Sequence, residues 1–153
     1  MKLNETIEFY IRTTSLALSR VYNSYAAEYG ISQTIGYILT YVEKEGTPST
    51  RLAQQLGMKN SSLTRLLKKM EADGCITRVI DEKDKRVIRV FLTPKGVQRR
   101  KIAKAKVLEF NEKIAKKVNR KDLDTFFKVF DIIKEQVVEE VESRKKFEEI
   151  VEE

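Results

Sequence analysis

Six residues between positions 61 and 69 combine small hydroxyl groups with positive charges. They are Ser61, Ser62, Thr64, Arg65, Lys68 and Lys69. Steps of three and four residues connect them, so on a helix they would share one side. Hydroxyls at a helix N-terminus allow close approach to phosphate, arginine can pair with a guanine edge, and lysines can pair with phosphates. The pattern predicts a helix that reads the major groove of DNA, with a merely solvated helix face as the alternative.

A second group of charges, DEKDKR, occupies positions 81–86. Runs rich in β-branched residues, 76–80 and 87–92, flank this group, so it is expected to form the exposed loop of a β-hairpin. An arginine on such a loop can enter a narrow minor groove, where the negative potential is strong. The sequence therefore predicts DNA contacts from Lys83, Lys85 and Arg86. The alternative is a polar loop whose charges only keep the sheet edge soluble.

The charge distribution agrees with both predictions. The chain has 153 residues and a net charge of +7, yet residues 59–106 alone carry 15 basic and 5 acidic side chains. The last segment, residues 135–153, carries 3 basic and 8 acidic side chains. A concentrated basic excess is expected of a surface that meets a polyanion.

The composition excludes several other functions. The chain has no histidine and a single cysteine, Cys75, so it can form neither an internal disulfide nor a histidine-based catalytic triad. A structural zinc site, which usually needs four Cys or His ligands, is also excluded. No apolar run approaches the ~18 residues of a membrane span, and the first residues lack the apolar stretch of a signal peptide. We expect a cytoplasmic protein that is not an enzyme, needs no cofactor or metal and has no membrane partner.

Helix signals divide the chain into six helices and one hairpin. Asn4 is expected to cap a first helix that ends before Gly30, and Ser32 a second that ends before Gly46. Two Thr-Pro pairs, at 47–48 and 93–94, are expected to cap and open the third helix (49–56) and a long basic helix that runs to about residue 118. The predicted groove-reading helix spans about residues 60–72. Asn119 is expected to cap the last helix.

This order predicts a mainly α fold with a small β-hairpin, in which residues 31–92 form a winged helix-turn-helix. The helices of segments 1–30 and 93–153 are not needed to build that module. Their apolar stripes require another partner, and a second copy of the chain is the simplest one. We therefore expect a single domain, residues 1–153, whose flanking helices form a homodimer.

Four segments carry a resemblance to a known family. They read TPSTRLAQQLG at 47–57, SSLTRLLKKME at 61–71, DGCITR at 73–78 and DKRVIRVFLTPKG at 84–96. In this order they resemble the MarR family of transcription regulators. The resemblance implies a homodimer on a pseudo-palindromic operator, with Asp84 bracing the wing and Arg86 reaching the minor groove. It places five residues on the face of the recognition helix: Ser61, Ser62, Thr64, Arg65 and Lys68.

The resemblance leaves a ligand site unassigned. Many family members sense small phenolic or other apolar anions in a cleft between the dimerisation helices and the winged domain. No motif here fixes such residues, although six tyrosines crowd the first two helices, where they suit either a cleft or a helix interface. The chain lacks the N-terminal cysteine of the family's peroxide sensors and the histidines of its zinc-responsive members. Cys75 is expected to be a buried structural thiol.

The sequence thus predicts a DNA-binding transcriptional regulator of the repressor type, with release by a small-molecule effector as a further hypothesis. A sequence-tolerant architectural DNA-binding protein is the alternative, and a protein-interaction module is a second one. The operator, the regulated genes and the effector are not predicted.

Overall fold

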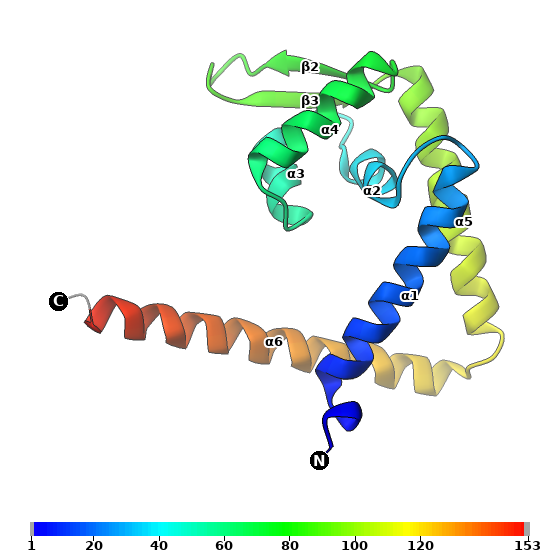
Figure 1. Ribbon diagram of the computed structural model, residues 1–153, viewed down its shortest axis with the longest axis vertical. Helices are drawn as coiled ribbons and strands as arrows, with labels where there is room; N and C mark the ends of the chain where they lie inside the picture. Colours follow the sequence, from blue (N-terminus) through cyan, green and yellow to red (C-terminus); the bar gives the residue numbers. More distant parts are fainter. Residues whose placement is uncertain (1, 152–153) are drawn as a thin grey trace. The chain divides into compact units, whose positions relative to one another are not determined.

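The computed structural model describes the backbone of residues 2–151 and the side chains through residue 144. The chain divides into two compact units, Met1–Leu108 and Glu109–Glu153. The elements are η1 (Leu3–Glu5), α1 (Ile7–Ala27), α2 (Gln33–Tyr41), β1 (Thr47–Pro48), α3 (Ser49–Gln55), α4 (Asn60–Ala72), β2 (Ile76–Ile80), β3 (Ile88–Leu92), α5 (Pro94–Ala115) and α6 (Arg120–Val151), and Figure 1 labels all of them except η1 and β1. Among the described helices, none is long and apolar enough to cross a membrane.

The core of the first unit lies where α2, α3 and α4 meet the sheet. Apolar positions three and four apart on each helix point inward, as the periodicity predicts. The most buried side chains include Ile38, Leu39, Leu52, Leu63, Leu67, Met70, Ile76 and Val90. This core supports the predicted winged helix-turn-helix, and the mainly α fold class is confirmed.

The sheet has three antiparallel strands in the order β1-β3-β2. The predicted hairpin is present as β2 and β3, with Ile76 paired to Leu92 and Ile80 to Ile88. The strand β1 was not predicted. Thr47 pairs with Val90 and is fully buried, so it is a strand residue and does not cap a helix. Pro48, expected at the first helical position, is instead the residue before α3.

Three predicted helix caps are confirmed. The side chains of Ser32, Thr93 and Asn119 accept hydrogen bonds from backbone amides three residues on, at 3.3, 3.1 and 2.9 Å. The prediction for Asn4 is wrong, because residues 3–5 form a separate turn of 3-10 helix and Thr6 caps α1. α5 also ends at Ala115, three residues before its predicted end.

Candidate nucleic-acid interface

The predicted recognition helix is α4. It buries Leu63, Leu67 and Met70, with Leu66 half-buried against the same core. The opposite face leaves all six predicted residues exposed: Ser61, Ser62, Thr64, Arg65, Lys68 and Lys69. The structure thus places them on one accessible surface, with hydroxyls toward the N-terminal end and the lysines farther along.

One of these hydroxyls already has a local role. Oγ1 of Thr64 donates to the carbonyl of Asn60 at 2.8 Å, one turn earlier in α4. The donor capacity of this hydroxyl is therefore used within the helix, while its oxygen can still accept a hydrogen bond. Ser61 and Ser62, nearer the helix N-terminus, are exposed as well. If Thr64 contacts a DNA base, its hydroxyl oxygen would accept a hydrogen bond from that base.

Both ends of α4 are fixed to neighbouring elements. At its start, the turn from α3 passes through Gly57, whose φ of +60° suits glycine, and the Met58 amide donates to the Ala53 carbonyl at 2.9 Å. At its end, the carboxylate of Glu71 accepts from Nε of Arg78 at 2.9 Å and from the Arg78 amide at 3.2 Å. The hydrogen bond from the Arg78 side chain lowers the pKa of Glu71. This pair ties α4 to the first strand of the wing.

The loop of the wing is organised around Asp81. Its Oδ1 accepts from the amides of Lys83 and Asp84, at 2.8 and 3.0 Å, and its Oδ2 pairs with the side chain of Arg89. The Arg89 hydrogen bond, followed by the two amide bonds, lowers the pKa of Asp81 to about 2. Sequence reasoning missed this residue. The sequence did contain a signal for this role: an aspartate at the first position of a loop commonly accepts a hydrogen bond from the backbone amide two residues later.

The predicted wing cations are all exposed. Lys83, Lys85 and Arg86 lie in the loop between β2 and β3, and the Arg86 side chain is 92% exposed. Oδ1 of Asp84 accepts from the Arg86 amide at 3.0 Å and lies 3.2 Å from its Nε. Asp84 therefore contacts Arg86 itself, whereas Asp81 holds the loop to the strand. A bracing role for Asp84 stays a prediction.

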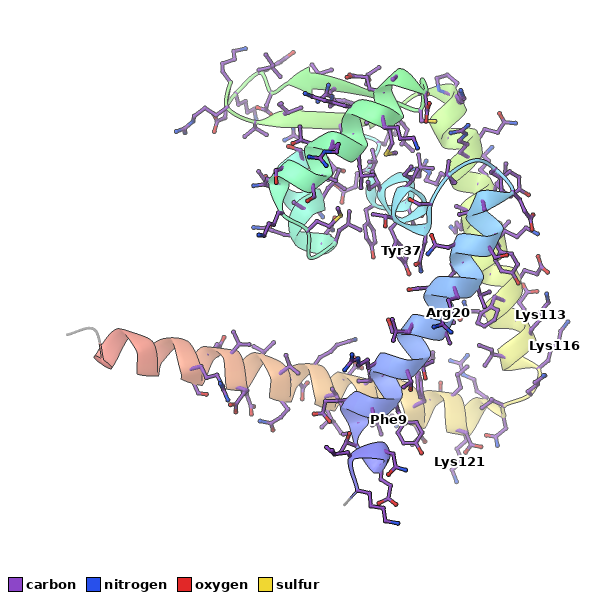
Figure 2. The ribbon with its side chains drawn as sticks, viewed as in Figure 1. Phe9, Arg20, Tyr37, Lys113, Lys116 and Lys121 are labelled. Carbon is purple, nitrogen blue, oxygen red and sulfur yellow. The ribbon has the colours of Figure 1, made fainter. Side chains whose placement is uncertain are left out.

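A cavity in the first unit is lined by side chains from α1, α2 and α5. Its apolar walls hold four of the six tyrosines, and two cations from α5 also line it: the lining includes Tyr22, Tyr25, Tyr29, Tyr37, Gly36, Arg99, Ile102 and Lys106. Nζ of Lys106 lies 5.6 Å from the centre of the Tyr25 ring, and Gln33 donates to the Tyr37 hydroxyl at 3.0 Å. Figure 2 shows Tyr37 on α2. Aromatic walls with a few polar groups suit a small apolar ligand.

Among the side chains that the structure describes, which extend through residue 144, no group of three or more His, Cys, Asp or Glu residues is placed to hold a metal ion. The single thiol, Cys75, is buried and free.

Comparisons with known proteins find similarity to transcription regulators. The MarR family model matches residues 38–88. The HTH-type transcriptional regulator TtmR of Methylorubrum extorquens is 30% identical over 95 residues, which cover 61% of this chain and 49% of TtmR, about half its length. The HTH-type transcriptional regulator SarZ of Staphylococcus aureus is 29% identical over 112 residues, covering 72% of this chain and 76% of SarZ.

Solved structures share the fold. The S. aureus MepR–DNA complex has a TM-score of 0.78 at 16% identity, covering 86% of this chain and 98% of MepR. The transcriptional regulator SlyA has a TM-score of 0.75 at 19% identity, and the match covers 85% of this chain and 92% of SlyA. At these identities the likeness extends to the winged-helix fold.

Proposed function

We propose that this chain is a MarR-type transcriptional regulator that binds specific sites in double-stranded DNA through α4 and the wing; the match of residues 38–88 to the MarR family model and the similarity to HTH-type transcriptional regulators support this proposal. The observation that carries this proposal is the exposed face of α4, which presents hydroxyls and cations at helical spacing while its opposite face is buried. The wing adds an arginine that is almost fully exposed. The two surfaces are tied together by the pair of Glu71 and Arg78.

The residues divide into two roles. Arg65, with Ser61, Ser62 and Thr64, lies on the exposed face of α4 and would discriminate bases in the major groove. Four lysines and one arginine would contact phosphates or the minor groove, and they are Lys68, Lys69, Lys83, Lys85 and Arg86.

We further propose a homodimer formed by the helices of segments 1–30 and 93–153, with residues 31–92 as the DNA-binding part. The support is apolar surface that each unit leaves exposed. In the first unit, α1 exposes Ile7, Phe9, Tyr10 and Leu16, and Figure 2 shows Phe9 near the start of this helix. In the second unit, α6 exposes Phe126, Phe127, Val129, Ile132, Val137, Val138 and Val141. Exposed apolar patches of this kind mark protein interfaces.

A selection of bound duplexes from a random pool, at about 150 mM salt, tests this function. Recovery of an inverted repeat with centres about one helical turn (~34 Å) apart is the expected result. Inserting about 5 base pairs between the two halves should then abolish the preference, because it rotates them to opposite faces of the duplex. Retained DNA without a motif would favour the architectural alternative. No retained DNA would overturn DNA binding.

The cavity supports release of the DNA by a small apolar anion, which would make the regulator a ligand-responsive repressor. Arg99 and Lys106 supply positive charge among the tyrosines, and no acid lines the cavity among the described residues. Such a ligand acts only if it binds better to a dimer whose recognition helices are badly spaced for the groove. If saturating 1-naphthoate shifts the melting temperature but never the affinity for DNA, release by this class of ligand is wrong.

A further inference from the structure

One side chain on the α5 wall of the cavity also reaches the end of the recognition helix. Arg99 lines the cavity, and its Nη1 donates to Sγ of Cys75 at 3.2 Å. Cys75 is 1% exposed and lies in the turn between α4 and β2. Its amide donates to the carbonyl of Met70, in the last turn of α4, at 2.9 Å. Arg99 therefore connects the cavity to α4 through a single intermediate residue.

The bond between Arg99 and Cys75 is the weakest tie at this junction. Lys95 donates to the Asp73 carbonyl at 2.6 Å, and Thr93 donates to the Gly74 carbonyl at 2.7 Å. Both acceptors are backbone oxygens, whereas a cysteine sulfur is a weak acceptor. A carboxylate would bind the guanidinium with charge-assisted hydrogen bonds, which are about twice as strong as neutral ones. Within the described residues, no carboxylate forms an ion pair with Arg99.

We propose that Arg99 is the positioning residue that couples the cavity to the recognition helix. An anion bound in the cavity takes the guanidinium from Cys75, so the C-terminal end of α4 loses one of its ties to α5. The ties made by Lys95 and Thr93 remain, so α4 shifts and does not detach. This inference rests on the proposed release of DNA by a ligand, for which it names the regulating contact.

The experiment measures the affinity of the selected duplex with and without saturating 1-naphthoate, and follows naphthoate binding separately by calorimetry. The uncharged 1-naphthamide serves as the ligand control. In the wild type, naphthoate is expected to weaken DNA binding about 5- to 150-fold, the usual range of coupling between two sites. Naphthamide should leave it unchanged.

Three variants separate the contact from the cavity. Cys75→Ala keeps Arg99 and the cavity, so naphthoate should bind at least as tightly while its effect on DNA falls below about twofold, less than typical coupling. Arg99→Gln should weaken naphthoate binding and abolish the effect on DNA. Lys101→Gln removes one positive charge from an exposed position of α5 that does not line the cavity, and should change neither quantity. If Cys75→Ala does not fold, Arg99→Gln and Lys101→Gln decide the outcome.

The possible failures can be told apart. If naphthoate binds and releases DNA in both Arg99→Gln and Cys75→Ala, the coupling role of Arg99 is wrong while ligand release stands. If naphthoate does not bind the wild type, both the ligand class and the coupling are overturned. DNA binding itself is decided independently by the duplex selection.

Discussion

Nε of Arg78 lies 2.9 Å from Oε2 of Glu71, and the Arg78 amide lies 3.2 Å from Oε1 of the same carboxylate. Glu71 of α4 thereby binds both the side chain and the backbone amide of Arg78 in β2. Because α4 carries the proposed base-reading residues and β2 leads into the wing, we expect this pair to fix the angle between the two proposed DNA-contacting surfaces. Such a carboxylate is a positioning group that need not touch the DNA.

Replacing Glu71 by Gln should lower the melting temperature and weaken DNA binding, because the amide cannot replace the charged pair. The pKa of Glu71 is lowered below 4.5 by Arg78, so its stabilising contribution is present above pH 4.5 and is lost as the pH falls through the lowered value. Thermal melts of wild type and variant should differ at pH 7 and converge in strong acid. Glu82→Gln, at an exposed wing position, is the control. Equal melts of wild type and Glu71→Gln at pH 7 would remove this role.

Replacing Asp81 by Asn should loosen the wing. The lowered pKa of about 2, against an ordinary 3.8, means that the stabilising contribution of the carboxylate is complete above pH 3.8 and disappears as the pH falls through 2. Amide hydrogen exchange of Lys83 and Asp84 should be faster in Asp81→Asn than in the wild type at neutral pH. Unchanged exchange of these two amides would show that Asp81 does not order the loop.

Gly46→Ala should destabilise the first unit more than Gly57→Ala does. Both glycines have positive φ, +78° and +60°, a conformation that costs another residue about 1–2 kcal/mol. A Cβ at Gly46 would also collide with the ring of Phe91, whereas a Cβ at Gly57 meets nothing within 4 Å. Overpacking should add about 1–3 kcal/mol for Gly46→Ala alone. Urea unfolding compares the two variants, and equal losses would mean that the Phe91 ring moves aside.

Arg65→Ala should cost about 1–3 kcal/mol on the selected duplex and relax the preference at one base pair. The reason is loss of a bidentate contact to a base edge, which carries sequence information. Affinities for duplexes mutated one position at a time provide the measurement. An equal loss on all sequences would assign Arg65 to the phosphates.

Lys68→Ala should weaken binding nearly uniformly across sequences. Loss of one phosphate contact should reduce the salt slope by about 1, because one fewer counterion is released. Titrations at several salt concentrations measure that slope. An unchanged slope would remove Lys68 from the phosphate contacts.

The helices and the hairpin were predictable because their signals are local. The two Thr-Pro pairs show the limit of such local signals. At Thr93–Pro94 the threonine caps α5 as predicted, with Oγ1 accepting from Gly96. At Thr47–Pro48 the same dipeptide enters the sheet, because Thr47 can pair with Val90 and its hydroxyl oxygen accepts from the Glu43 amide. The competing partner is a strand more than 40 residues away, which the local sequence does not indicate.

The candidate site likewise contains residues that local sequence predicts and residues that only folding brings together. The exposed face of α4 follows from one helical period, so its six residues were all predicted. The role of Asp81 depends on Arg89, which the hairpin brings back beside it, and the cavity is assembled from α1, α2 and α5. The clustering of the tyrosines is visible in the sequence, but Arg99 and Lys106 join four of them only in the folded cavity.

Specific recognition of DNA by α4 and the wing predicts a large difference in affinity between a selected duplex and a scrambled one. The most direct test is the ratio of the Kd for a scrambled duplex to the Kd for the selected duplex, both measured at the same salt concentration. A ratio of about 10³ or more is expected of a specific regulator. A ratio near 1, with strong binding to both duplexes, would contradict the claim and identify a protein that coats DNA through its charge.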